Sequence, residues 1–431
     1  MLSLPLPRPW RSLISRHRGW SGLLAGVALG VVGTLLATHL VKPGTKPLEP
    51  GTITILSGED SAVDSQRDAL IQQWNKLPGV PHAKLVPLKG DADAHYSAMV
   101  AEAERGDSEV DVFNLDVPWM TQFIERGYLR PLEKGVDESG FLRKPLETCK
   151  HDDRLWALPF NTDAGLLFYR QSVVSGPPSS WHAMTKMASD VLLDPSMSFE
   201  AGYIGQLADY EGLTVNAIEA IWSAGGAVVD SDGEVVVDSP EAREGLWRLA
   251  QGLLETNPQI ILPEAKLAKE TTSMEAFRDG KVIFMRNWPV AYRQIAQKES
   301  DFNVAVLPGP SVLGGQNLAI AKSSDQPRAA QKLIEFLTSE RSQQILFERG
   351  GLAATRHLVY QDVKVRDQYP YAQTLLNAVQ GARLRPLTRN YPVFSAEFRR
   401  GVQYALGHSG EWPPGFTQRL SDALQGKVPV G

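Results

Sequence analysis

Segments typical of strands alternate with segments typical of helices after residue 51, and this alternation restricts the fold more than any other feature of the sequence. Short apolar runs indicate strands at residues 52–56, 84–88 and 110–115. Apolar residues spaced by three or four positions indicate helices at residues 62–75, 95–105 and 118–127. This order predicts a parallel sheet, and ligands of open parallel sheets bind at the carboxyl ends of the strands.

The second half of the chain shows the same alternation without repeating the sequence. We predict helices at residues 210–223, 240–255, 270–279, 326–339 and 342–349, and a helical tail at 370–424 with a break at RLRPLTRNYP. We predict a strand at residues 282–285, a hairpin that turns at Asp232 and Gly233, and two strands around a Gly/Pro loop from residue 304. A chain of 431 residues can build two cores, so the predicted fold class is α/β with two lobes.

Polar side chains follow the first and third predicted strands. Glu59 and Asp60 follow the first strand after Ser57 and Gly58, and Asp116 comes directly after the third strand. Such residues can cap the next helix, and Asp60 or Ser61 is well placed to do so. Glu59 and Asp116 fit a capping role less well, because of their distance from the next helical segment. The sequence therefore predicts carboxylates at one edge of the sheet.

A third polar group, Asn161, Thr162 and Asp163, interrupts two apolar runs in the segment RLWALPFNTDAGLLFYR at residues 154–170. Buried polar groups are unfavourable unless they are paired, so polar residues in a buried strand are expected to have a hydrogen-bonding partner, which is often a ligand. Either the triplet forms a polar turn between two strands, or it meets a ligand. The segment alone leaves both interpretations open.

Charge and cysteine content exclude several classes of function. The net charge is −5, and the sequence after residue 41 has no basic patch with interleaved aromatic residues, which argues against nucleic-acid binding. A single cysteine, Cys149, excludes a disulfide within the chain and a cysteine-based metal cluster. His95 and His357 lack the spacing of metal ligands. We predict no metal and no cofactor.

The N-terminal residues predict one membrane-spanning helix. Residues 19–41 contain no Asp, Glu, Lys or Arg and are long enough to cross a bilayer. Four arginines precede them, so the positive-inside rule predicts that residues 1–18 are cytoplasmic and that the rest of the chain is extracytoplasmic. The alternative is a signal peptide, but the apolar run is long, its end is a poor cleavage site, and no cysteine follows to accept a lipid. Residues 42–51, KPGTKPLEPG, predict a short linker.

Six segments occur in a recognisable order along the chain. They are VDVFNLDVPWMTQFIERGYLRPL, ALPFNTDAGLLFYR, YEGLTVNAIEAIWSAGG, AFRDGKVIFMRNWPVAY, LPGPSVLGGQNLAIAKSS and RLRPLTRNYP. Together they make residues 51–425 resemble the extracellular solute-binding proteins of bacterial ABC sugar importers, in the group of maltose- and trehalose-binding proteins. The resemblance implies a periplasmic-binding-protein-like fold with two lobes, a hinge and a central cleft.

The resemblance also implies where the lobes begin and end. The first lobe would contain residues 52–161 plus 304–359, and the second would contain residues 162–303 plus 360–431. The segment at 155–169 would then pass from one lobe to the other. This would place the polar triplet at the floor of the cleft, beside the hinge.

The binding residues implied by the resemblance come from both lobes. Sugar hydroxyls need paired donors and acceptors, and the C–H faces of sugar rings need flat apolar surfaces. Trp288, at the end of a predicted strand, would stack on a ring, and Arg383 or Arg385 would lie near the cleft. The implied hydroxyl-binding residues are Glu59, Asp60, Asp116, Asn161, Asp163, Tyr210, Glu211 and Glu270.

One loop departs from the family pattern. Many relatives carry an aromatic residue in the loop that matches residues 313–319, at the position of Gln316. We include Gly315 and Gln316 among the binding candidates. Replacing a stacking ring by an amide would change which sugar is preferred.

The resemblance implies a monomeric receptor that is not an enzyme and that delivers a di- or oligosaccharide to an ABC permease. Closure of the lobes around the ligand would be the signal that the permease reads. One alternative is a membrane-tethered sugar sensor. Another is a glycoside hydrolase, which needs one protonated carboxyl group and a second carboxyl group at a fixed separation. The sequence does not give such separations.

Overall fold

The computed structural model describes residues 47–106 and 109–427. The chain divides into two compact units, Met1–Leu48 and Glu49–Gly431, and every helix and strand described below belongs to the second. The predicted cytoplasmic segment and membrane-spanning helix lie outside the described residues. Within the described part of the chain, no helix combines the length and the apolar character needed to span a bilayer.

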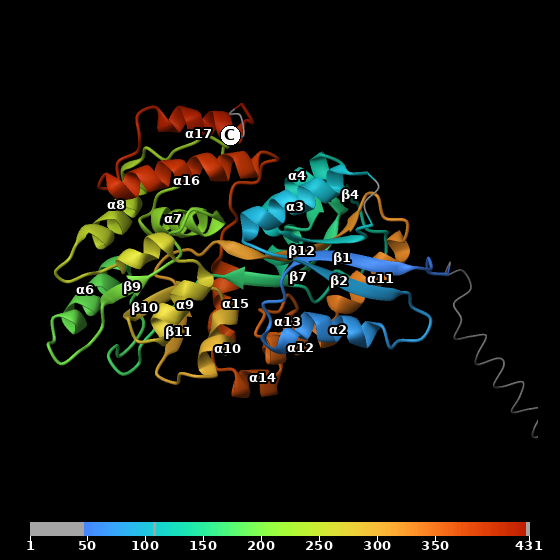
Figure 1. Cartoon of the computed structure of the whole chain (residues 1–431), viewed down its shortest axis with the longest axis horizontal. Helices are drawn as coiled ribbons and strands as arrows, with labels where there is room; N and C mark the ends of the chain where they lie inside the picture. Colours follow the sequence, from blue (N-terminus) through green and yellow to red (C-terminus); the bar gives the residue numbers. More distant parts are fainter. Residues whose placement is uncertain (1–46, 107–108, 428–431) are drawn as a thin grey trace, which may run out of the picture. The chain divides into compact units, whose positions relative to one another are not determined.

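The first of the two main sheets has the strand order β2-β1-β3-β12-β4, and β7 pairs with the other end of β12. β1 is parallel to both β2 and β3, as the predicted strand–helix order requires, whereas β12 is antiparallel to β3, β4 and β7. Figure 1 shows these strands together. They are β1 (Thr52–Gly58), β2 (His82–Leu88), β3 (Val112–Asp116), β4 (Leu129–Arg130), β7 (Ala157–Ala164) and β12 (Leu313–Ala321).

Helices of the first lobe cover this sheet, mostly where the sequence predicts them. The predicted helix at 62–75 begins instead as a 3-10 turn, η1 (Val63–Ser65), because Asp64 and Ser65 have positive φ angles and delay the α-helix. The others are α2 (Gln66–Trp74), α3 (Ala92–Glu104), η2 (Val117–Trp119), α4 (Met120–Glu125), α5 (Arg143–Glu147), α11 (Pro327–Leu337), α12 (Glu340–Ile345) and the π-turn η4 (Leu346–Gly350). Two short helices, α13 (His357–Gln361) and α14 (Val363–Gln368), follow and pack against each other. A small separate hairpin joins β5 (Lys150–His151) to β6 (Arg154–Leu155).

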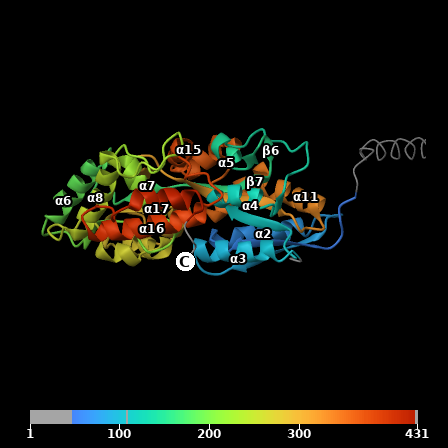
Figure 2. The same ribbon diagram turned by 90° about the horizontal axis from the view of Figure 1, so that it is seen from above.

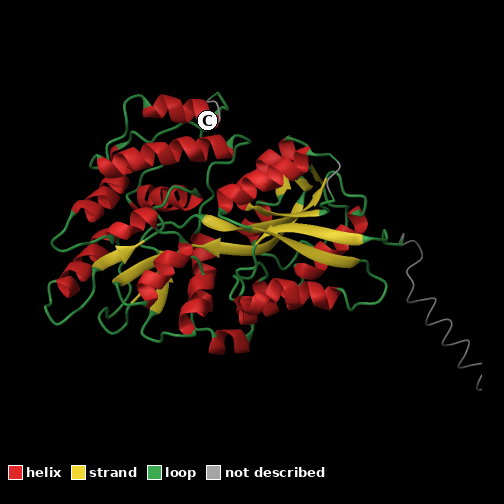
Figure 3. Ribbon diagram, viewed as in Figure 1, coloured by secondary structure: helices red, strands yellow, loops and turns green. Residues whose placement is uncertain are grey.

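The second main sheet has the order β11-β8-β10-β9, and Figure 3 shows it as a separate group of strands. Its strands are β8 (Leu166–Tyr169), β9 (Ala201–Ile204), β10 (Val282–Asn287) and β11 (Asn303–Val306). The predicted hairpin around Asp232 forms one antiparallel bridge, between Val229 and Val235, and its polar turn residues are exposed.

Eight helices and one 3-10 turn surround the second sheet or lie beside the hinge. In α7, all residues from Glu211 to Ile221 are buried, because α8 and α16 pack against it. Figure 2 shows α16 beside α7 and α17. The elements are α6 (Trp181–Leu192), α7 (Glu211–Ser223), α8 (Pro240–Leu254), η3 (Pro263–Leu267), α9 (Glu270–Arg278), α10 (Val290–Ala296), α15 (Ala372–Gly381), α16 (Tyr391–Gly407) and α17 (Phe416–Leu424).

Two segments, which we call the first and the second crossing segment in chain order, pass between the sheets side by side. β7 ends at Ala164 and β8 begins at Leu166, so Gly165 alone separates a strand of the first sheet from a strand of the second. The chain returns between β11 and β12, across residues 307–312. The expected lobe boundary at residue 304 is too early, because residues 304–306 pair with β8 in the second sheet and the first sheet resumes only at Leu313.

Candidate ligand-binding cleft

A cavity of about 430 Å³ is lined by residues from both lobes. The first lobe contributes residues at the carboxyl ends of β1 and β3, where the parallel strands predict a site, together with residues of β7 and β12. The second lobe contributes the starts of α7 and α9 and the residues after β10. The cavity therefore lies where the strand ends of one sheet face the helix starts of the other lobe.

Most of the predicted binding residues line this cavity. They are Glu59, Asp116, Asn161, Asp163, Tyr210, Glu211, Glu270, Trp288, Gly315, Gln316 and Arg385. Asp60 and Arg383 are not among the lining residues. The structure thus brings together side chains that lie more than 300 positions apart in the sequence.

Asp60 holds the first helix instead of facing the cavity. Its carboxylate accepts hydrogen bonds from the backbone N–H groups of Ala62 (3.0 Å), Arg67 (2.9 Å) and Asp68 (3.3 Å). This is the capping chemistry that its position before a helix allows. The Asp60 carboxylate also lies 3.7 Å from Nε of Arg67.

Arg383 belongs to the hinge, and Arg385 is the arginine that lines the cavity. The backbone of Arg383 accepts from the N–H of Leu313 (2.8 Å) and donates to the carbonyl of Ser311 (2.8 Å). Its guanidinium lies 5.7 Å from the ring of Trp222. Arg385 is 6% exposed and donates to Oε1 of Glu211 at 2.6 Å.

The carboxylate of Glu211 is already occupied by protein partners. Besides Arg385, it accepts from the hydroxyls of Ser395 (2.6 Å) and Tyr391. Glu211 is predicted to bind a ligand hydroxyl, but three buried partners leave its carboxylate little free acceptor capacity. Its main effect is to fix Arg385 at the wall of the cavity.

A polar network that includes Gln316 forms the wall on the side of the first sheet. The Gln316 amide nitrogen donates to Oδ1 of Asp116 (3.1 Å), while its oxygen accepts from Arg67 (3.0 Å) and from Asn114 (3.2 Å). Both ends of the amide are thus fixed. Burial raises the pKa of Asp116, against the lowering effects of Arg385 and the Gln316 amide.

Arg67 is a lining residue that the sequence reasoning missed. It is 3% exposed and comes from α2, where it shares one buried helix face with Leu70, Ile71 and Trp74. Arg67 precedes these three apolar residues by three, four and seven positions, which is the spacing of one helix face. This spacing could have revealed Arg67 as a buried residue, since an arginine on an apolar helix face needs a buried partner.

The polar triplet lies in β7 and contributes two of its three residues to the cavity. The Asn161 amide donates to Oδ2 of Asp163 at 3.1 Å. Burial raises the pKa of Asp163 to about 7, although the charge of Arg67 and the hydrogen bond from Asn161 act in the opposite direction. Thr162 is buried and does not line the cavity.

Trp288 faces this polar wall from the second lobe. Its indole N–H donates to Oε1 of Glu270 at 3.4 Å, and its backbone N–H donates to the side chain of Asn287 at 2.8 Å. A Cβ atom built on Gly314 would lie 3.2 Å from the indole, so β12 passes close to the ring. The ring is half-buried, which suits a platform for an apolar face of a ligand.

Two ion pairs connect the lobes beside the cavity. Asp91 and Asp93, at the start of α3, lie 2.6 Å from Nζ of Lys269 and 2.9 Å from Nη2 of Arg399, respectively. We call these four residues the cross-cleft pairs. They belong to opposite lobes, so the described conformation is closed over the cavity.

Within residues 47–106 and 109–427, no group of three or more His, Cys, Asp or Glu side chains is arranged to hold a metal ion. The arrangement offers hydrogen-bond donors and acceptors on one side and an aromatic face on the other.

Comparison with known proteins identifies the class to which this geometry belongs. A family model described as "Bacterial extracellular solute-binding protein" matches residues 71–371, and the chain belongs to this family. The members of this family are substrate-binding proteins and not enzymes, which removes the hydrolase alternative. The protein is therefore a solute-binding component of an ABC transporter.

Individual relatives support the same class. A probable ABC transporter-binding protein of Deinococcus radiodurans is 30% identical over 337 residues, which cover 73% of this chain and 78% of the relative. A maltotriose-binding protein of Pyrococcus abyssi is 25% identical over 293 residues, which cover 64% of this chain and 61% of the relative.

Solved structures have the same two-lobed fold. Maltose-bound MalE3 of T. maritima has a TM-score of 0.80 and 28% identity, with 88% of this chain and 100% of that chain covered. The GacH receptor of Streptomyces glaucescens, solved unliganded and with acarbose, has a TM-score of 0.74 and 22% identity, with 88% and 99% covered.

Proposed function

We propose that the cleft binds a saccharide of two or more units and that the protein delivers it to the membrane permease of an ABC importer. The observation that carries this proposal is the placement of the Trp288 indole opposite a wall of fixed carboxylates and amides. Sugars combine apolar ring faces with dense hydroxyl groups, and this pairing of surfaces suits them. The maltose and maltotriose named for relatives agree with the proposal.

Closure would couple binding to delivery. The ligand contacts come from both lobes, so only the closed form can make all of them, and binding shifts the population toward closure. The closed form then presents both lobe faces to the permease. The soluble part would act as a monomer.

We also propose that residues 19–41 form an uncleaved membrane anchor, with residues 1–18 in the cytoplasm and the lobes outside. The uncharged length of the segment and the arginines before it support this. The mass of the mature protein from membrane fractions tests the anchor, since a cleaved signal would remove the segment.

A calorimetric screen tests the proposed ligand class. The fragment from residue 47 is titrated with glucose, trehalose, maltose and maltotriose, with ribitol as a control that lacks a sugar ring. We expect at least one sugar of two or more units to bind more tightly than glucose and ribitol. Binding of ribitol alone, or of none of the sugars, would contradict the proposal.

A further inference from the structure

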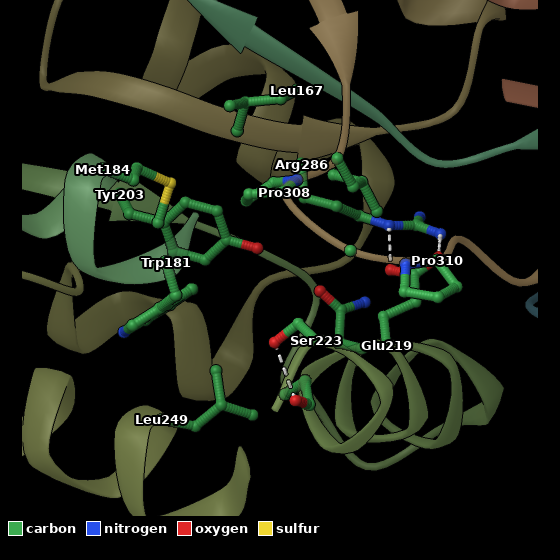
Figure 4. Close-up of a pocket in the computed structure, with 14 residues that line it drawn as sticks. Leu167, Trp181, Met184, Tyr203, Glu219, Ser223, Leu249, Arg286, Pro308 and Pro310 are labelled. Carbon is green, nitrogen blue, oxygen red and sulfur yellow. Dashed lines mark hydrogen bonds and ion pairs between the residues drawn. The ribbon is translucent and has the colours of Figure 1, made fainter. Parts of the chain in front are cut away.

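A small cavity of about 40 Å³ lies inside the second lobe, apart from the main cleft, and Figure 4 shows the residues around it. One side is apolar and includes Trp181, Met184 and Leu249. The other side contains the charged pair Arg286 and Glu219, which point toward each other. The cavity is too small for a sugar, but it marks where two charged side chains are buried in an apolar lobe.

The pair is buried and bidentate. Arg286 is 1% exposed and Glu219 is 6% exposed. Nε and Nη2 of Arg286 each donate to one carboxylate oxygen of Glu219 at 2.9 Å, and Nη1 donates to the side chain of Gln206 at 3.3 Å. A bidentate pair fixes both position and angle, which a single contact does not.

Glu219 also contacts the segment by which the chain returns to the first sheet. Its Oε1 atom accepts from the backbone N–H of Val312 at 3.0 Å and lies 3.3 Å from the Ser311 hydroxyl. These residues directly precede β12. The Glu219 carboxylate therefore holds the end of the second crossing segment.

The same pair contacts the first crossing segment. The backbone N–H of Gly165 donates to the Ser311 hydroxyl at 2.6 Å. A Cβ atom built on Gly165 would lie 2.9 Å from Nε and Nη2 of Arg286 and from Oε1 of Glu219. The segment between β7 and β8 thus passes directly against the ion pair, with no room for a side chain.

Arg286 reaches the ligand site through Trp288. Its guanidinium carbon lies 3.8 Å from the centroid of the indole ring that lines the main cavity. A cation at this distance from a tryptophan ring attracts it and restricts its position. One buried side chain therefore touches both the hinge and the aromatic surface of the cleft.

We propose that Arg286 and Glu219 are positioning residues that couple the angle between the lobes to the placement of the Trp288 ring. This inference rests on the proposed function, since it treats Trp288 as part of the ligand site. When the crossing segments move, Glu219 moves with them, and its bidentate contact turns the Arg286 guanidinium beneath the indole. The aromatic surface is then in position only when the lobes are closed.

Stability alone does not account for such a pair. A buried ion pair contributes little net stability compared with apolar residues of the same volume, whereas its geometry is specific. The specific geometry of the Arg286–Glu219 pair fixes its contacts with the two crossing segments and with the Trp288 ring.

The second lobe contains a matched control for the experiment. Arg170 is 3% exposed, donates to Glu299 at 2.9 Å and lies 4.5 Å from the ring of Phe277. Like Arg286, it is a buried arginine that pairs with a glutamate and lies over an aromatic ring, but it contacts that glutamate through one nitrogen. Unlike Arg286, it lies over a ring that does not line the main cavity, and the hydrogen bonds of its partner Glu299 go to Arg170, Ser300 and Asp301 and not to a crossing segment.

The experiment compares Arg286→Lys with Arg170→Lys in the full chain. Lys134 and Leu193 are exposed in opposite lobes and are each replaced by cysteine. Labels on these two cysteines report the distribution of distances between the lobes. The native cysteine, Cys149, is buried and therefore does not take up the label. Titration with maltotriose reports affinity. We expect Arg286→Lys to broaden the ligand-free distance distribution and to weaken maltotriose binding by about tenfold, and Arg170→Lys to change neither.

Unchanged interlobe distances in Arg286→Lys, or an equal change in Arg170→Lys, would overturn the inference. If Arg286→Lys does not fold, the neutral double variant Glu219→Gln/Arg286→Met, which leaves no unpaired buried charge, takes its place with the same expected result. If the wild-type protein binds no saccharide, the proposed function fails. The ligand-free distance distribution then still decides whether the pair controls the hinge.

Discussion

At the scale of single residues, the cleft combines groups that the sequence predicts well with groups that it does not. Asp163 stands out because it interrupts the apolar runs of residues 154–170, and Trp288 stands out because it follows the end of a predicted strand. Asp60 stands at a similar point, yet it caps a helix, since a carboxylate after a strand serves either role. Arg67 was missed because its burial depends on partners from other elements, such as Gln316.

Asp163 makes the stability of the protein depend on pH. Its pKa of about 7 in the folded protein exceeds the value of about 4 expected for an unfolded chain, so the folded state binds the proton more tightly. The stabilising contribution is complete below about pH 4 and is lost as the pH rises through about 7. We expect the ligand-free protein to melt at a lower temperature at pH 8 than at pH 5.5.

Replacing Asp163 by Asn should flatten this pH dependence. Thermal melts of the wild type, Asp163→Asn and the exposed control Asp153→Asn, each at both pH values, measure it. The control shows the effect of removing an exposed carboxylate, because the other groups that titrate in this range, such as Asp93 with a pKa raised to about 6 by burial, are the same in all three proteins. Equal pH slopes in all three proteins would show that Asp163 does not hold a proton near neutral pH.

Removing the indole ring tests the aromatic side of the cleft. We expect Trp288→Ala to weaken saccharide binding by more than about tenfold, because a ring face loses its stacking partner. The melting temperature should change little, since the ring is only half-buried. Trp247→Ala, at a ring that is 45% exposed in the same lobe and outside the cavity, should bind normally. Normal binding by Trp288→Ala would remove this ring from the site.

At the scale of elements, the sequence predicts most helices and strands but not how the crossing segments are joined. The runs at 52–56 and 84–88 become β1 and β2, with the predicted parallel pairing. The run at 304–306 also becomes a strand, β11, but its partner is β8 in the second sheet. The pattern of apolar residues identifies a strand, whereas the strand with which it pairs depends on contacts with residues far away in the sequence.

The crossing between β7 and β8 depends on Gly165. A methyl group at this position would lie 2.9 Å from three atoms of the Arg286–Glu219 pair, so we expect Gly165→Ala to lower the free energy of unfolding by about 1–3 kcal/mol. Denaturant unfolding measures this. Gly176→Ala serves as the control, because a Cβ atom there meets no atom within 4 Å. Equal stabilities of the two variants would mean that the crossing tolerates a side chain.

At the scale of the whole folded unit, the described conformation is held closed by contacts that no sequence pattern reveals. Lys269 and Asp91 are separated by 178 positions, and each would look like an ordinary surface charge. The two-lobed fold could be predicted from the strand–helix order and the family resemblance. Contacts between lobes depend instead on the angle at which the lobes meet, which is set by the hinge.

The cross-cleft pairs should stabilise the closed form. Partly exposed ion pairs each contribute about 1 kcal/mol or less, so we expect Asp91→Asn/Asp93→Asn to weaken saccharide binding by about two- to tenfold at pH 7.5. The two side chains lie outside the lining of the cavity, so the loss should come from closure and not from a lost ligand contact.

Salt provides the check that separates closure from other causes. Because ions screen these exposed pairs, the affinity of the wild-type protein for a neutral sugar should fall as salt is raised from about 0.05 to 0.5 M, whereas the affinity of the double variant should change much less. Glu411→Gln, which breaks an exposed pair with Arg243 within the second lobe, is the control and should keep the wild-type salt dependence. If the double variant kept the same salt dependence as the wild type, the cross-cleft pairs would not contribute to closure. The Arg286–Glu219 pair at the hinge would then be left as the main link between the angle of the lobes and ligand binding.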